Sequence, residues 1–404
     1  MDIFTSIALF LRQLMSNIGL AEWLIDLIMA ILRAATLGTA GLLTFMLLTW
    51  IERKLIARMQ DRLGPTVHGP GGILIPLADG IKMITKEDTI PEGADRPVYW
   101  LAPLLTATAV IIVFAVIPFG PDTGGGALVG TSLNVGIVYV LAVGAAGVIA
   151  VLMAGWSSNN KYALLGAFRA VAQLISYEVP QVLTVVAVVM LAGTMDLVEM
   201  VHVQTVPFIF PLFLAAIVFF ISGVAETGRA PFDLLEAESE IVAGYHIEYS
   251  AMKFSLVMMA EFIHAFLVGA LFVTLFLNGW NGPIAGLDVV WFFLKCVGMF
   301  FIMIWFRGTF PRFRIDQLMA FNWKFLVPLS LINLLVVAIG DRLLVSLGWS
   351  RAEDPWAWGL SLFAVNVVLL LAASIVAGRV GRRARERDRA KAAARAMAPA
   401  TSGR

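Results

Sequence analysis

The chain has 404 residues, of which 60% are hydrophobic and only 14% charged, with a formal net charge of +1. Ordinary soluble domains carry about 25% charged residues, so this composition argues against a water-soluble body. The single cysteine, Cys296, and the four histidines are too few for an iron–sulfur cluster or a structural zinc site, and no glycine-rich phosphate-binding loop occurs.

Nine apolar segments approach or exceed the roughly 20 residues that a helix needs to cross a bilayer. In chain order they cover residues 29–50, 98–119, 135–156, 171–192, 206–225, 251–277, 289–306, 324–347 and 356–378. Because they recur along the whole chain, we predict an all-α polytopic membrane protein whose residues 1–378 form a single transmembrane domain. Residues 379–404, rich in arginine and alanine, are predicted to form a basic, disordered tail.

Lysine and arginine gather on one side of these predicted spans. Most of the 29 basic residues fall in the loops after the first, third, fifth and seventh spans or in the C-terminal tail. The loops on the other side are rich in Gly, Pro and Asn. By the positive-inside rule, the basic side is predicted to be cytoplasmic and the N-terminus to lie outside.

Residues 72–87, between the first two spans, have the pattern of a short interfacial amphipathic helix on the cytoplasmic side. Ile73, Leu77 and Ile84 recur at helical spacing, while Asp79 and Lys82 fall on another face. The alternative is that this helix merely seals the bundle at the headgroup level.

Carboxylates inside the spans are the most informative residues, because an ionisable side chain in a membrane is costly and usually functional. Glu178 and Glu261 lie within predicted spans, and Glu226 closes the fifth span. An acidic loop follows Glu226 as far as Glu248. These positions suggest a proton-conducting line, with a solvated acidic surface as the alternative.

His264 follows Glu261 by three residues, a Glu-x-x-His pair of the kind that ligates metals in helical bundles. Di-iron sites need two such pairs and further glutamates, and this chain has only one pair. We therefore expect no metal, and no cofactor bound by this chain alone.

Several long stretches between about residues 50 and 335 resemble the NuoH family, the core membrane subunit of bacterial respiratory complex I. They include Glu52-Arg-Lys54, Leu77-Ala-Asp-Gly-Ile-Lys82, Lys161-Tyr-Ala-Leu-Leu-Gly166, Ile175-Ser-Tyr-Glu178, Arg229-Ala-Pro-Phe-Asp233, Glu236-Ala-Glu-Ser-Glu240 and Pro311-Arg-Phe-Arg-Ile-Asp-Gln-Leu318. The sequence departs from the family pattern at Thr66-Val67-His68 and at Gly228.

The resemblance implies a tilted bundle of about eight core helices, plus a C-terminal ninth, in a bacterial plasma membrane. Members of this family wall the chamber through which ubiquinone or menaquinone enters a proton-pumping NADH:quinone oxidoreductase. FMN and iron–sulfur clusters then belong to partner subunits. The expected partners are the peripheral-arm subunits at the quinone site and the small and antiporter-like membrane subunits.

The resemblance also implies roles for individual residues, none of them catalytic in this chain. Chamber and entrance positions are Glu52, Arg53, Asp79, Lys82, Arg229, Phe232, Asp233, Glu236 and Glu238. The proton path comprises Glu178, Glu226, Glu240, Glu248 and Glu261. Supporting loop charges are Arg169, Arg312, Arg314 and Asp316.

Two other functions stay open at this point. The chain could be the homologous subunit of a reduced-deazaflavin dehydrogenase or an energy-converting hydrogenase, which would keep the carboxylates and change the electron donor. It could also be a stand-alone transporter or channel. Transporters often have internal repeats with broken helices at mid-membrane, and no repeat is visible here.

Overall fold

The computed structural model describes residues 3–19, 21–121, 129–234, 242–284, 286–349, 351 and 353–397. Every regular element in these residues is a helix. The helices are α1 (Ile3–Asn17), α2 (Glu22–Met59), η1 (Pro70–Gly72), α3 (Ile75–Thr85), α4 (Arg96–Phe114), α5 (Gly136–Ser157), α6 (Lys161–Ala192), α7 (Leu197–Val203), α8 (Phe213–Glu226), η2 (Gly244–His246), α10 (Ala251–Phe276), α11 (Asp288–Thr309), α12 (Ile315–Phe321), the π-helical turn η3 (Asn322–Leu326), α13 (Val327–Ser346) and α14 (Pro355–Met397).

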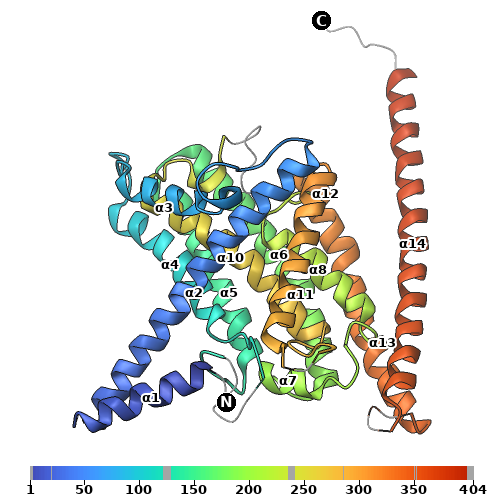
Figure 1. Ribbon diagram of the computed structural model, residues 1–404. Coiled ribbons are helices and arrows are strands. Elements are labelled where there is room, and N and C mark those ends of the chain that lie inside the picture. The colour runs from blue at the N-terminus through green and yellow to red at the C-terminus, as the bar shows by residue number, and fades with distance from the viewer. Residues whose placement is uncertain are drawn as a thin grey trace, which may run out of the picture.

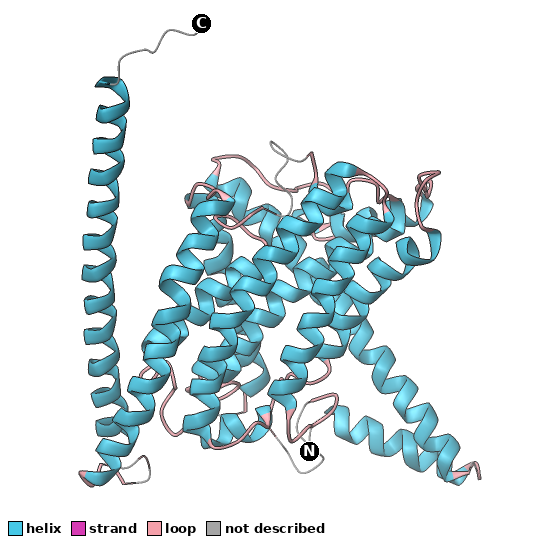
Figure 2. Ribbon diagram, turned by 180° about the vertical axis from the view of Figure 1, so that it is seen from behind, coloured by secondary structure: helices cyan, strands magenta, loops and turns pink. Residues whose placement is uncertain are grey.

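The long helices form one tilted bundle with two distinct ends (Figure 1). At one end lie α3 and α12, and we call this the α3 end. At the other lie α1 and α7, which mark the α7 end. Seen from behind, α14 stands apart from the upper part of the bundle and joins it near the α7 end (Figure 2).

The predicted all-α membrane architecture is confirmed. Among the described residues, eight helical segments are long and apolar enough to cross a membrane, and these correspond to eight of the nine predicted spans. The fifth predicted span, 206–225, differs because its helix α8 has only 14 residues. At 1.5 Å per residue, α8 covers about 21 Å, less than the roughly 30 Å of a bilayer core.

Two prolines explain why α8 starts late. Pro207 and Pro211 have no backbone N–H, so a helix through them would lose hydrogen bonds and meet steric clashes. The chain before α8 instead forms turns, and Nδ2 of Asn366 on α14 donates to the carbonyl of Pro211 at 3.0 Å. Irregular backbone at membrane depth is tolerated where protein groups satisfy its hydrogen bonds. The same contact attaches α14 to the start of α8.

Beyond its apolar part, α14 continues as a helix to Met397. This helix includes part of the stretch, from residue 379 onward, for which the sequence pattern predicts a basic tail. Alanine and arginine are both strong helix formers, which favours this continuation.

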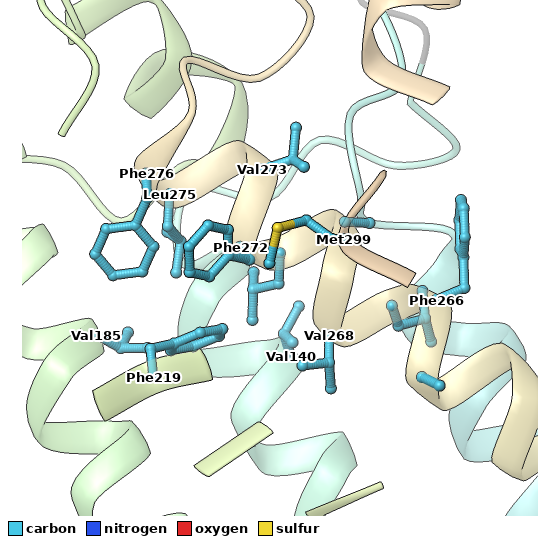
Figure 3. Close-up of a cluster of buried hydrophobic side chains, with 14 of the residues drawn as sticks. Val140, Val185, Phe219, Phe266, Val268, Phe272, Val273, Leu275, Phe276 and Met299 are labelled. Carbon is cyan, nitrogen blue, oxygen red and sulfur yellow. The ribbon is translucent and has the colours of Figure 1, made fainter. Parts of the chain in front are cut away.

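Helix α10 is the central element of the bundle, and most of its apolar segment is buried, including Phe272 and Phe276. Phe219 of α8 lies 6.1 Å from Phe272 and 5.6 Å from Phe276, between ring centroids, and Figure 3 shows this cluster. A Cβ on Gly223 of α8 would lie 2.4 Å from a methyl carbon of Val268, so the glycine lets the two helices approach closely. This packing places the polar residues of α10 inside the protein.

One backbone hydrogen bond of α6 is missing at Pro180, because proline has no N–H to donate to the carbonyl of Ser176. Nδ2 of Asn322, the first residue of η3, donates to that carbonyl at 2.5 Å. The α12–α13 segment thus satisfies the group that the proline leaves free. Glu178 lies between these two positions, so its surroundings are fixed by contacts from a distant part of the chain.

Candidate functional site

A buried carboxylate with two arginine partners lies at the α3 end. Glu52 on α2 is 4% exposed, and its Oε2 lies 2.6 Å from Nη1 of Arg229. Nη1 of Arg307, the basic residue in the last turn of α11, pairs with the other carboxylate oxygen. The Arg229 guanidinium also lies over two aromatic rings, 5.1 Å from the centroid of Phe262 and 4.9 Å from that of Phe300. Arg229 therefore ties α2, α10 and α11 together.

These residues line a cavity of about 650 Å³, which we call the charged cavity. Its wall comes from α2, the loop after α2, the start of α3, the loop after α8, α10 and Arg307. Two arginines paired with one carboxylate leave a formal excess of one positive charge in the wall of this cavity. Such an excess favours a polar guest that accepts hydrogen bonds or gains negative charge.

A second ion-pair group fastens α3 to α2. Nη1 of Arg53, which lines the charged cavity, lies 2.7 Å from Oδ2 of Asp79, and Nζ of Lys82 lies 3.0 Å from Oδ1. Partial burial by itself raises the pKa of Asp79, but the hydrogen bonds and charges of Lys82 and Arg53 outweigh it and hold the pKa below its usual value. Asp79 is therefore an ionised anchor for the amphipathic helix.

The loop after α8 is held by both backbone and side-chain contacts. Nε2 of Gln173 on α6 donates to the carbonyls of Ala225 and Phe232, at 2.7 and 2.8 Å. Asp233, which also lines the charged cavity, pairs with Arg312 at 3.3 Å. These contacts fix the part of the loop that carries Arg229.

A second cavity, of about 130 Å³, is lined by carboxylates, and we call it the carboxylate cavity. Glu178 of α6, Glu226 of α8, and Glu261 and His264 of α10 all line it, together with Tyr245 of η2. Nε2 of His264 lies 3.4 Å from Oε1 of Glu226, and the Tyr245 hydroxyl donates to Oε1 of Glu261 at 3.4 Å. Most of the remaining wall is apolar.

The two cavities adjoin, because Thr227 and Glu261 line both of them. Glu261 lies about three turns into α10, and its neighbour Phe262 faces the charged cavity. A change of charge in one cavity is therefore felt directly by a carboxylate of the other.

Comparison with known proteins decides the family. A family model described as NADH dehydrogenase matches residues 32–338. The chain belongs to this family.

The curated relatives of this NADH dehydrogenase family member are named as the H subunit of NADH-quinone oxidoreductase. That of Dehalococcoides mccartyi strain CBDB1 is 51% identical over 297 residues, covering 74% of this chain and 82% of the relative. An H subunit of Syntrophobacter fumaroxidans is 47% identical and covers 78% and 96%. The Geobacillus thermodenitrificans protein is 48% identical and covers 74% and 90%.

The structure brings half of the predicted site residues, nine of eighteen, into two groups. Of the chamber residues, Glu52, Arg53, Arg229 and Asp233 line the charged cavity, with Asp79 and Lys82 attached through Arg53. Glu178, Glu226 and Glu261 line the carboxylate cavity. Glu236, Glu238 and Glu240 lie outside the described residues.

The other predicted residues lie elsewhere. Phe232 is buried and faces an apolar groove between α8, α11 and α12, beside the charged cavity. Glu248 lies in a separate polar pocket, where Nδ2 of Asn160 donates to it at 2.7 Å. Arg169 is half-buried on α6, while Arg314 and Asp316 are exposed at the start of α12.

Three site residues were missed by sequence reasoning. Arg307 was counted only as a basic residue that sets orientation, although its place at the end of an apolar span could have marked it. His264 was considered only as a metal ligand, and among the described residues no group of three or more His, Cys, Asp or Glu could hold a metal ion. Tyr245 lies in the 3-10 turn η2 and carries no local sequence signal.

A buried lysine fastens the segment after α3 to the start of α10. Lys253 is 3% exposed, its Nζ lies 2.9 Å from Oδ2 of Asp88, and it sits 3.9 Å from the ring centroid of Trp100. Beside it, the backbone N–H of Thr89 donates to Oγ of Ser250 at 3.1 Å. Asp79 lies on α3 and Glu261 lies on α10. This junction therefore connects a helix attached to the charged cavity with the helix whose Glu261 lines both cavities.

Proposed function

We propose that this chain is a membrane subunit of an NADH:quinone oxidoreductase, in which it forms the quinone-access chamber and couples quinone reduction to proton translocation. Family membership and the names of the relatives support the enzyme class. The observation that carries the coupling role is that Glu261 and Thr227 line both the charged and the carboxylate cavity.

In this proposal the charged cavity receives the quinone headgroup, and the α3 end is the cytoplasmic side facing the peripheral-arm subunits. The N-terminus then lies outside. The exposed apolar side chains of α3, Leu77, Ile81 and Ile84, would rest in the interfacial layer of the membrane. FMN and iron–sulfur clusters in partner subunits would supply the electrons.

Reduction of a quinone to a quinol consumes two electrons and two protons. Taking up these protons changes the charge felt by Asp233 and by the Arg229–Glu52–Arg307 group at the cavity wall. Glu261 lies at the boundary and responds by changing its proton occupancy. Because the carboxylates of the second cavity are close together, they titrate as a coupled group, and the change passes on to Glu226 and Glu178.

The test is Glu261→Gln in the assembled, purified complex reconstituted into liposomes. We expect NADH-driven proton translocation to fall at least about tenfold, because a neutral amide cannot take up or release a proton. The matched control is Glu199→Gln on α7, an exposed glutamate at the opposite end of the bundle. Wild-type rates of both quinone reduction and proton translocation in Glu261→Gln would refute the coupling role.

A further inference from the structure

His264 is the basic member of the carboxylate cavity. It lies on α10, three residues after Glu261, and its Nε2 is 3.4 Å from Oε1 of Glu226 on α8. Its side chain is 29% exposed and that of Glu226 is 17% exposed, so the pair is largely sheltered. The contact crosses between two helices that the close approach at Gly223 holds together.

His264 is surrounded by carboxylates, so its protonation would change the charge balance of the carboxylate cavity. Glu178 reaches the cavity from α6, Glu226 from α8 and Glu261 from α10, while Tyr245 contributes a hydroxyl. No lysine or arginine stands among the described residues that line this cavity. His264 is therefore the one described lining residue that can carry positive charge, and a buried carboxylate is costly without a compensating positive charge.

One carboxylate oxygen of Glu226 accepts no hydrogen bond from the described residues. This oxygen, Oε2, is buried, while Oε1 faces His264. A carboxyl group in this position is stabilised either by holding a proton or by a neighbouring cation. The two states interconvert when one proton moves between Glu226 and His264.

We propose that His264 is a proton-relay residue that exchanges a proton with Glu226 and passes it on within the carboxylate cavity. In the step, the protonated Glu226 carboxyl gives its proton to Nε2 of neutral His264, which leaves a carboxylate facing an imidazolium. The imidazolium then releases the proton on its Nδ1 to water or to a second carboxylate, Glu178 or Glu261. The ring returns to the neutral state, and one proton has moved.

Imidazole suits this role for two reasons. It is the side chain that ordinarily changes charge between about pH 5 and 8, and its two nitrogens let a proton enter on one side and leave on the other. The cavity, at about 130 Å³, has room for water molecules that complete the path. This inference rests on the proposed coupling function and adds a specific carrier to it.

The decisive variant is His264→Gln in the assembled complex reconstituted into liposomes. Glutamine can still donate a hydrogen bond to Glu226 but cannot be protonated. We expect NADH-driven proton translocation to fall about 100-fold, the lower end of what a positioned acid–base group contributes. If the relay operates, the wild-type translocation rate should change between about pH 5 and 8, and the variant should lose this change. His202→Gln, an exposed histidine on α7, is the matched control and should behave as wild type.

Wild-type translocation with an unchanged pH profile in His264→Gln would overturn the relay and leave His264 a structural hydrogen-bond partner. If His264→Gln does not assemble, the smaller His264→Asn is measured by the same criteria, and failure of both to assemble would likewise assign a structural role. Glu261→Gln separates the two proposals. A loss in Glu261→Gln alone refutes only the relay, whereas no loss in either variant refutes the coupling function itself.

Discussion

Nη1 of Arg229 lies 2.6 Å from Oε2 of Glu52, although 177 positions separate the two residues in the chain. Both side chains are less than a tenth exposed. Removing one partner of a buried ion pair leaves an uncompensated charge and is strongly destabilising. This pair therefore holds the α3 end together as well as lining the charged cavity.

Glu52→Gln should lower the stability of the assembled complex around this chain by about 3–5 kcal/mol, because both Arg229 and Arg307 lose their counter-charge. Thermal unfolding of the purified complex measures this. Glu22→Gln, an exposed glutamate in the first turn of the same helix, is the control and should change stability by less than about 0.5 kcal/mol. An unchanged unfolding temperature for Glu52→Gln would contradict the assignment of a buried, paired carboxylate.

Because His246 is buried, we expect the folded segment after the acidic loop to lose stability at acidic pH. It is 7% exposed, packs 5.6 Å from the Phe254 ring, and burial lowers its pKa from 6.5 to about 4. Between these values the unfolded segment binds a proton that the folded segment does not, so stability falls as the pH drops from 6.5 towards 4. The loss at pH 5 should be on the order of 2 kcal/mol.

Hydrogen exchange of residues 242–250 in the assembled complex at pH 7 and pH 5 checks this. After correction for the slower intrinsic amide exchange at lower pH, weaker protection at pH 5 than at pH 7 is expected for the wild type. His246→Phe should remove most of this difference, since phenylalanine does not titrate. Equal protection of the wild type at both pH values would show that His246 is not held neutral by burial.

Gly166 on α6 packs directly against η2, so a larger residue at this position should disturb the packing there. A Cβ at this position would lie 2.8 Å from the Cα and carbonyl carbon of Gly244, which are backbone atoms and cannot easily give way. Gly166→Ala should therefore destabilise the complex by about 1–3 kcal/mol and disturb Tyr245, which contacts Glu261.

Gly147→Ala on α5 is the matched control, because its added Cβ would meet nothing within 4 Å. Alanine there should be neutral or slightly stabilising, since it is the better helix former. Thermal unfolding of the two variants side by side makes the comparison. Equal unfolding temperatures would mean that η2 does not pack tightly on α6.

Much of the fold follows from local features of the sequence. Apolar runs of about 20 residues predict spanning helices wherever they occur, because each helix satisfies its own backbone in the bilayer. Local features also explain why the predicted span 206–225 forms only a short helix, since Pro207 and Pro211 delay the start of α8. The carboxylates Glu178, Glu226 and Glu261 could be singled out for the same reason, as charges in segments that are otherwise apolar.

The partners of these residues could not be predicted. That Arg307 shares Glu52 with Arg229, that His264 faces Glu226 and that Tyr245 reaches Glu261 depend on how each helix is rotated against its neighbours. Rotation is decided by packing, as where Gly223 admits Val268 and where Asn322 satisfies the carbonyl of Ser176. The sequence by itself determined which charges enter the membrane, because that depends only on spacing along one helix. The tertiary structure alone decided which charges meet, because that depends on contacts between helices far apart in the chain.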